Sequence, residues 1–271
     1  MAYTTPNSTI IYPPKGNRYL HRKVLLRPVG VDGSAVATAQ VATPPGRLVA
    51  YKADFTSQPA TVDTLLKADT ADGVTIKTLA DATDKVLFPL GTTARKSTDA
   101  ATSAVDAFGG GFPIRSGVFI DIAQGDGQTT GDETVEIDLY FRLCTYLRMV
   151  VSADSGVDGS AVIVRTIDLH GPGSLAAVAV DYQNMPATTD ILIKSDNTNG
   201  VTLFTRTSSL TDLAPTLIGR AGEDEAANVT AATDGTEGAN MFNRGIFLDV
   251  AQADAFTGGD EKIVIECWID Q

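Results

Sequence analysis

The chain repeats three blocks of sequence in the same order, and this duplication constrains its fold more than any other feature. The paired segments are VDGSAV at 31–36 and again at 157–162, PATVDTLLKADTADGVTIKTL at 59–79 with PATTDILIKSDNTNGVTLFTR at 186–206, and SGVFIDIAQGDGQTTGDETVEI at 116–137 with RGIFLDVAQADAFTGGDEKIVI at 244–265. The second pair is identical at 11 of 21 positions, and the offsets between copies are 126, 127 and 128 residues. The 271 residues therefore contain a tandem duplication of a unit of about 125 residues.

A unit of this length exceeds the repeats of solenoid proteins, so each copy is expected to be a domain with its own core. We predict a first domain over 23–143 and a second over 144–271. The junction near Arg142–Tyr146 contains no Gly, Pro or Ser linker. Residues 1–22 contain Pro6, Pro13 and Pro14, which disfavour a helix or a central strand. We predict an extended arm there, with an edge strand through 8–12.

The rest of the chain consists of short runs rich in Val, Ile, Leu, Phe and Thr that alternate with polar residues. In TVEIDLYF at 134–141, polar and apolar side chains alternate from Thr134 to Leu139. Such alternation is typical of half-buried antiparallel strands. In the first copy we predict strands at 23–31, 35–42, 46–55, 61–69, 73–80, 85–90, 117–124 and 134–143. The segment 97–108 is predicted to form a long loop or one or two helical turns. The spacing indicates an all-β fold, either a sandwich or a barrel.

The charge is strongly acidic but unevenly distributed. The net charge is −12, which excludes nucleic acid and anionic membranes as main partners because both require a basic face. Five cations and no acids precede Asp32, so the first 31 residues carry +5, while the later 16 cations and 33 acids give −17. A basic arm on an acidic body indicates docking onto a like neighbour or another acidic surface. The candidate contact residues in this region are Lys15, Arg18, Arg22 and Lys23. The alternative is a solvated tail.

The hairpin that is repeated at 65–78 and 192–205 has Asp72-Gly73 in one copy and Asn199-Gly200 in the other. Both pairs tolerate the positive φ of a tight hairpin turn. The exchange of Asp for Asn keeps the backbone geometry and removes the charge. We therefore interpret this turn as a folding element and not as a metal ligand.

Two acidic loops, DGQTTGDE at 126–133 and DAFTGGDE at 254–261, are the best metal candidates because Ca²⁺ prefers oxygen ligands. Their spacing does not fit the EF-hand, and the middle of the loop varies between the copies, so we predict solvated loops and no metal site. Asp121 and Asp249 recur in both copies and are interpreted as outward-facing polar positions on strands.

The residues offer little for catalysis. His21 and His170 do not occupy matching positions, and GTTARKS at 91–97 lacks the glycine that a phosphate loop needs before its lysine. Cys144 and Cys267 lie in strand-like runs and are predicted to be buried free thiols. We expect no enzymatic activity, no catalytic residues and no cofactor. With no signal peptide pattern, synthesis is expected in a host cytoplasm.

FGGGFPIRSG at 108–117 corresponds to GANMFNRG at 238–245, which lacks the run of glycines. Three consecutive glycines permit either a close backbone approach or a flexible connection. One interpretation is an interface loop formed by Phe108, Gly109, Gly110, Gly111 and Phe112; the other is a long flexible connection.

The phrases PATTDILIKSDNTNGVTLFTR, AATDGTEGANMFNRGIFLDVAQAD and EKIVIECWID resemble those of decoration, or cement, proteins on the heads of tailed bacteriophages. The resemblance covers most of both copies and implies two β-sandwich, jelly-roll-like domains. It also implies a virion location on the outer capsid surface, the major capsid protein as partner, and a homotrimer that stabilises the expanded head. It supplies no site residues.

Two other classes remain open. A phage tail or baseplate component would have a similar sequence character. A carbohydrate-binding adhesion module would need exposed aromatic side chains in a groove, and Trp268 is the only tryptophan.

Overall fold

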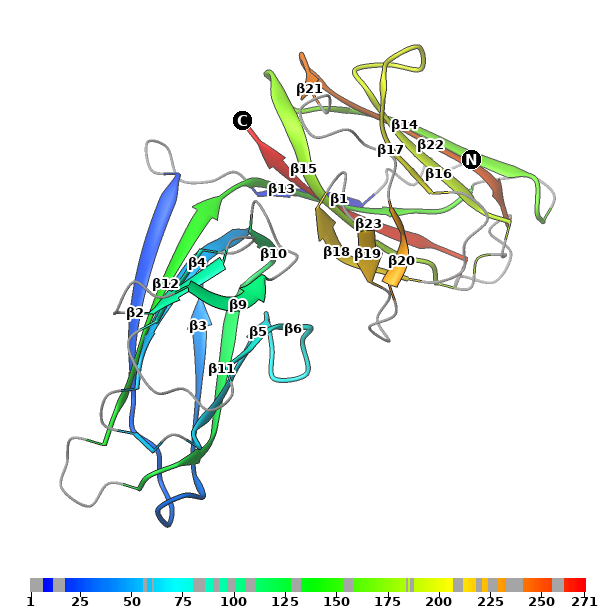
Figure 1. The fold of residues 1–271 in the computed structure, drawn as a ribbon. Coiled ribbons are helices and arrows are strands. Elements are labelled where there is room, and N and C mark those ends of the chain that lie inside the picture. The colour runs from blue at the N-terminus through cyan, green and yellow to red at the C-terminus, as the bar shows by residue number, and fades with distance from the viewer. Residues whose placement is uncertain are drawn as a thin grey trace. The chain divides into compact units, whose positions relative to one another are not determined.

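The structure is a computed structural model of the chain. It describes residues 7–11, 18–55, 58–59, 61–79, 86–89, 93–96, 101–105, 111–127, 133–153, 158–183, 185, 188–206, 212–217, 221–223, 229–232, 241–254 and 261–271. Within these ranges the regular structure is entirely β (Figure 1). No helix long and apolar enough to cross a membrane occurs in them. The described residues divide into two compact units.

The first unit lies within Pro13–Leu143. Its strands are β2 (Tyr19–Leu26), β3 (Ala35–Ala42), β4 (Gly46–Asp54), β5 (Asp63–Ala68), β6 (Thr75–Leu79), β7 (Val86–Pro89), β8 (Thr93–Lys96), β9 (Ala101–Val105), β10 (Phe112–Ile114), β11 (Gly117–Gly125) and β12 (Val135–Leu143). One sheet has the order β2-β12-β4-β7-β8-β9, with β10 also paired to β4, and the other has the order β3-β11-β5-β6. All of these pairings are antiparallel.

The second unit comprises Cys144–Gln271 together with β1 (Asn7–Ile11). Its other strands are β13 (Thr145–Val151), β14 (Ala161–Asp168), β15 (Gly173–Asp181), β16 (Asp190–Ser195), β17 (Thr202–Arg206), β18 (Leu213–Leu217), β19 (Ala221–Glu223), β20 (Val229–Ala232), β21 (Met241–Phe242), β22 (Gly245–Ala253) and β23 (Ile263–Asp270). The sheets have the orders β1-β13-β23-β15-β18, with β21 on β15, and β14-β22-β16-β17, while β19 pairs with β20.

The duplication is visible strand for strand. The strands β2 to β12 correspond in order to β13 to β23, and the central pairings β2-β12-β4 and β3-β11-β5 recur as β13-β23-β15 and β14-β22-β16. One strand has no counterpart among the described residues. The strand β1 pairs antiparallel with the outer edge of β13, from Asn7 opposite Val150 to Ile11 opposite Tyr146.

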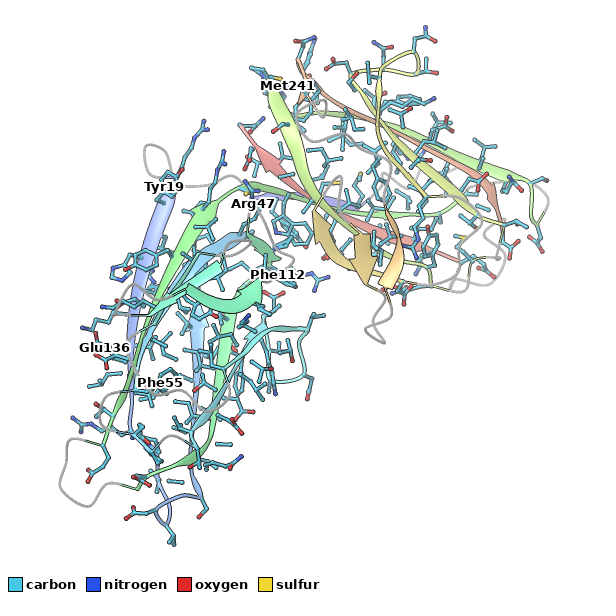
Figure 2. The ribbon with its side chains drawn as sticks, viewed as in Figure 1. Tyr19, Arg47, Phe55, Phe112, Glu136 and Met241 are labelled. Atoms are coloured by element: carbon cyan, nitrogen blue, oxygen red, sulfur yellow. The ribbon has the colours of Figure 1, made fainter. Side chains whose placement is uncertain are left out.

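Each unit is a sandwich with a hydrophobic core between its two larger sheets. In the first unit, Leu48 and Tyr51 of one sheet join Leu66 and Ile120 of the other in a single cluster. In the second unit, Val178 and Ile265 meet Ile193 and Leu248 in the same way. Phe55, labelled in Figure 2, is 1% exposed. The alternating pattern of the sequence produces these cores because every second side chain of a strand faces the opposite sheet.

The predicted all-β class with antiparallel sandwiches is confirmed. The expected edge strand over 8–12 corresponds to β1. The strand predicted at 23–31 is β2, which begins earlier, because Leu20 and Val24 already alternate with polar residues, and also ends earlier, at Leu26. Residues 19–22 therefore belong to β2 and not to an extended arm. The loop predicted for 97–108 contains β9.

Candidate functional site

The basic residues of the predicted contact region lie on and beside β2, the end strand of its sheet among the described residues. Lys15 lies outside the described residues. Arg18 immediately precedes β2, and Arg22 and Lys23 lie within it; all three are exposed. Figure 2 labels Tyr19 at the start of the strand. The structure thus gathers three of the four predicted cations along one sheet edge.

Two of the polar residues on β2 bind acids of the neighbouring strand β12. The Nζ of Lys23 lies 2.7 Å from Oε1 of Glu136, and this hydrogen bond raises the pKa of Lys23 above its usual value. The Nε2 of His21 lies 2.7 Å from Oδ1 of Asp138. The ring of His21 also stacks on Tyr140 at a centroid distance of 4.8 Å. This outward face of the first unit is polar and partly exposed.

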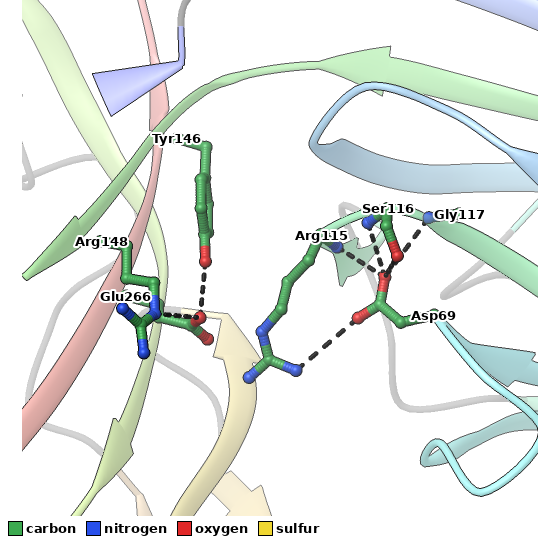
Figure 3. Close-up of polar contacts among 7 residues, drawn as sticks. All are labelled: Asp69, Arg115, Ser116, Gly117, Tyr146, Arg148 and Glu266. Atoms are coloured by element: carbon green, nitrogen blue, oxygen red, sulfur yellow. Dashed lines mark hydrogen bonds and ion pairs between the residues drawn. The ribbon is translucent and has the colours of Figure 1, made fainter. Parts of the chain in front are cut away.

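The equivalent face of the second unit is buried at Tyr146, Glu266 and Trp268. The hydroxyl of Tyr146 donates to Oε1 of Glu266 at 2.5 Å, and the Nε of Arg148 lies 3.8 Å from the same oxygen (Figure 3). Tyr146 packs edge-on against Trp268, which is fully buried. Position by position, Tyr146, Arg148, Glu266 and Trp268 replace the first copy's His21, Lys23, Asp138 and Tyr140.

The predicted interface loop divides into two parts. Phe108, Gly109 and Gly110 lie outside the described residues, so that part stays a prediction. Gly111 has a φ of 97°, and a side chain there would meet the carbonyl oxygen of Leu48 at 2.7 Å. Phe112 begins β10 and is 2% exposed. The structure therefore makes Phe112 a core residue of its own unit, because β10 lies against β4.

The repeated hairpin carries a polar site that the sequence reasoning missed. Asp69 adopts a φ of 63°, and its Oδ1 accepts backbone hydrogen bonds from Arg115, Ser116 and Gly117 at 2.8, 2.7 and 3.3 Å (Figure 3). The side chain thus closes the turn between β10 and β11.

Asp196, which also has a positive φ, does the same in the second unit. It accepts from the backbone of Asn243, Arg244 and Gly245. These hydrogen bonds, above all the one from the Arg244 backbone, lower the pKa of Asp196. The identity of Asp69 and Asp196 in the aligned copies was the signal that could have revealed the site.

The turn itself differs from the prediction. The left-handed conformation falls on Asp69 and Asp196, and not on the Asp-Gly and Asn-Gly pairs. Gly73 and Gly200 are needed for another reason: a Cβ there would lie 1.7 Å from the carbonyl oxygen of Ala68 or Ser195. The connection runs from Ala68 to Thr75 and is longer than a two-residue turn.

The duplicated strand carboxylates form ion pairs. The Nζ of Lys67 lies 3.3 Å from Oδ2 of Asp121, and the Nζ of Lys194 lies 3.3 Å from Oδ2 of Asp249. Asp121 and Asp249 are partly exposed, as expected for outward-facing positions. Each pair joins neighbouring strands of the smaller sheet, so these acids hold strands together.

The described ends of the acidic loops are likewise engaged. Oδ1 of Asp126 accepts from the backbone N–H of Gly33 at 3.0 Å, and Oδ1 of Asp254 accepts from that of Gly159 at 2.8 Å. Residues 128–132 and 255–260 lie outside the described part of the chain. Among the residues that the structure describes, no group of three or more metal-ligating side chains gathers.

The remaining candidates have local roles. Cys144 and Cys267 are buried free thiols, as predicted, and burial raises the pKa of Cys267 well above its usual value. His170 follows the strand β14, and its Nδ1 lies 3.2 Å from Oδ1 of Asp168. The guanidinium of Arg244 also binds Asp168, at 2.6 Å, and its hydrogen bond lowers the pKa of that carboxyl.

No family model matches the chain, and no curated protein matches its sequence. Among solved structures it is similar to PBCV-1 VP54 fitted into a reconstruction of the virophage Sputnik, with 9% identity, a TM-score of 0.25 and coverage of 96% of this chain and 95% of that chain. It is also similar to the STIV MCP, with 10% identity, a TM-score of 0.23 and coverage of 93% and 96%.

A third likeness is to the major capsid protein P2 from bacteriophage PM2, with 8% identity, a TM-score of 0.25 and coverage of 93% and 97%. At TM-scores this low, these likenesses assign neither a family nor an activity to the chain.

Proposed function

We propose that this chain is a virion structural protein that binds the outer surface of a capsid as a symmetric oligomer and stabilises the expanded head. Two points support this: the resemblance to decoration proteins, and the structural role of the polar residues that both copies retain. The partner is the major capsid protein, the oligomer is a homotrimer, and the role is structural and not enzymatic.

The observation that carries the proposal is the role of the polar residues kept in both copies. Asp69 and Asp196 bind backbone N–H groups, and the pairs Lys67–Asp121 and Lys194–Asp249 join strands. Both copies have therefore retained the polar side chains that stabilise the sandwich. Rigid units that bury area across a joint between capsid subunits favour the assembled shell by mass action.

The copies differ on the outward faces of their equivalent sheets. The face with His21 and Lys23 is polar and partly exposed in the first unit, while the equivalent face with Tyr146 and Trp268 is buried in the second. The two equivalent faces therefore differ in what they can contact, and the polar face of the first unit is the exposed one. The first unit, with its basic edge, is the part that we assign to the capsid.

The test is cosedimentation of the purified protein with expanded capsids that lack it. We expect saturable binding, and a loss of binding when Arg22 and Lys23 are both changed to Glu. The double change leaves the apolar core untouched, because both side chains are exposed. Lys77→Glu on β6 is the control for altered charge elsewhere on the same unit. Capsids that retain no protein would overturn the proposal.

Copurification with separated heads and tails tests the first alternative. A tail or baseplate component would copurify with tails and not with full heads. For the carbohydrate-binding alternative, Trp268 is 0% exposed, so it is unavailable for stacking on a sugar. Binding to a glycan array that requires other aromatic side chains would favour that alternative.

A further inference from the structure

The two equivalent edge strands of the duplicated sheets have different neighbours. In the second unit, the outer edge of β13 pairs with β1 along five residues. In the first unit, the equivalent strand β2 pairs with β12 on one side, and no described strand lies on its other side. The second unit therefore shows that this edge of the fold accepts an added strand.

The backbone of β2 has hydrogen-bonding groups directed toward the open edge. The N–H of Leu143 donates to the carbonyl oxygen of Arg18 at 2.7 Å, which fixes the phase of the β2–β12 ladder. Since bonding alternates along an antiparallel pair, the even-numbered residues of β2 bond to β12. The residues whose N–H and C=O groups face outward along the edge are Tyr19, His21, Lys23 and Leu25.

The charge on β2 selects the kind of strand that can bind. Arg18, Arg22 and Arg27 make no ion pair with any residue that the structure describes. In contrast, β1 (NSTII) is uncharged, and β13 carries only Arg148. Cations on an edge strand repel another basic strand and favour carboxylates opposite them.

Apolar side chains on the same strand are exposed beside these charges. Tyr19 is 65% exposed and Leu25 is 52% exposed, and Figure 2 shows Tyr19 at the beginning of β2. Their side chains lie on the outward face, where an added strand would contact them. Cys144, which occupies the position equivalent to Tyr19 in the second unit, is 1% exposed.

We propose that the β2 edge of one copy binds an acidic extended segment of a second copy of this chain by strand addition. A second copy offers the negative charge that this basic edge favours, since its residues after position 31 carry −17. The basic edge and the acidic segment are different surfaces, so the contact is heterologous and forms a closed ring when the rotation permits. This contact links copies of the chain, and it can be absent even if the chain binds capsids.

The experiment is sedimentation velocity on the purified full-length chain at several protein and salt concentrations. Leu25→Pro is the sharpest variant because it removes an edge-facing N–H and leaves the β2–β12 ladder intact. Leu25→Thr is the matched control, since it shortens the same side chain and keeps the N–H. We expect wild type and Leu25→Thr to form the same oligomer, and Leu25→Pro to sediment as a monomer.

Charge reversal provides an independent second variant. Arg22→Glu is expected to weaken association about 100-fold, because like charges placed opposite each other disfavour a partner strongly. Lys77→Glu makes the same kind of change on β6, the end strand of the other sheet, and should associate like wild type. Far-ultraviolet circular dichroism and thermal unfolding check that every variant is folded.

A carbodiimide reaction, which joins amines to contacting carboxylates, tests the acidic nature of the segment. In a mixture of ¹⁵N-labelled and unlabelled chains, Lys23 should be joined to an acidic residue of the other chain, in addition to Glu136 of its own. A monomeric wild-type protein, or a folded Leu25→Pro variant that associates like wild type, would overturn the proposal.

Discussion

The outward faces of the two equivalent sheets show what duplication has changed and what it has kept. His21 and Asp138 form a partly exposed pair in the first unit, whereas Tyr146 and Glu266 form a buried one in the second. Behind these faces, the order of the central strands and the Asp69-type turn are the same. The core and the turns of the sandwich tolerate little variation, whereas one outer face can change its polarity without changing the fold.

The strongest test of this comparison is the truncation of the aromatic residue at the matched position. Trp268→Ala should destabilise the protein by about 3–5 kcal/mol, since Trp268 is fully buried and its loss leaves a cavity. Tyr140→Ala, at the partly exposed equivalent position, should cost less than half as much. Urea unfolding followed by circular dichroism measures both. Equal losses would mean that the two faces are equally buried.

The turn carboxylates test the shared part of the architecture. Asp69→Ala and Asp196→Ala should each cost about 2 kcal/mol, because each substitution deprives three backbone N–H groups of a charged acceptor. Asn at either position, which keeps one acceptor oxygen and tolerates a positive φ, should cost less than Ala. The same denaturation experiment measures these variants. A neutral Asp69→Ala beside a costly Asp196→Ala would show that only one copy depends on this turn.

Acid titration sharpens the comparison of the second unit with the first. The pKa of Asp196 is lowered in the folded state, so its stabilising contribution is present above the unfolded-state value of about 3.9 and is lost as the pH falls through the folded-state pKa. Asp196→Asn should therefore flatten the decrease in stability below about pH 4. Thermal unfolding between pH 7 and pH 2 provides the measurement. An unchanged dependence of stability on pH in this variant would show that Asp196 does not contribute to the loss of stability in acid.

The smallest effect is expected for the ion pairs on the partly exposed strands. Lys67→Met and Lys194→Met remove one ion pair from each copy and keep the aliphatic stem. Each should cost about 0.5 kcal/mol or less, in line with surface pairs, and the effect should decrease in high salt. Chemical denaturation in low and high salt compares the two variants. A loss several times larger in one copy would show that the pairs are no longer equivalent.

Much of the fold followed from the residues alone. The duplication, the β class and the antiparallel strands were readable because alternation with a period of two reports which side chains face a core. The buried thiols Cys144 and Cys267 were also predictable, because each lies in an apolar strand run. The positions of Asp121 and Asp249 as outward-facing strand residues could be predicted for the same reason.

The polar site around Asp69 and Asp196 could not be derived from spacing. Each carboxylate accepts hydrogen bonds from residues 46–49 positions away in the sequence, and only the folded chain brings these groups together. The sequence likewise placed Phe112 beside a glycine run, although β10 carries it into the core. Local patterns do not report such long-range pairing.

By itself, the sequence determined that there are two copies of one β unit and that the positive charge lies at the start of the chain. The tertiary structure decided which edges carry neighbours. An edge strand and a central strand have the same alternation, so only the sheet order shows that β13 pairs with β1 while β2 ends its sheet among the described residues. Hydrogen bonding between distant strands makes that distinction, and it leaves no local trace in the residues.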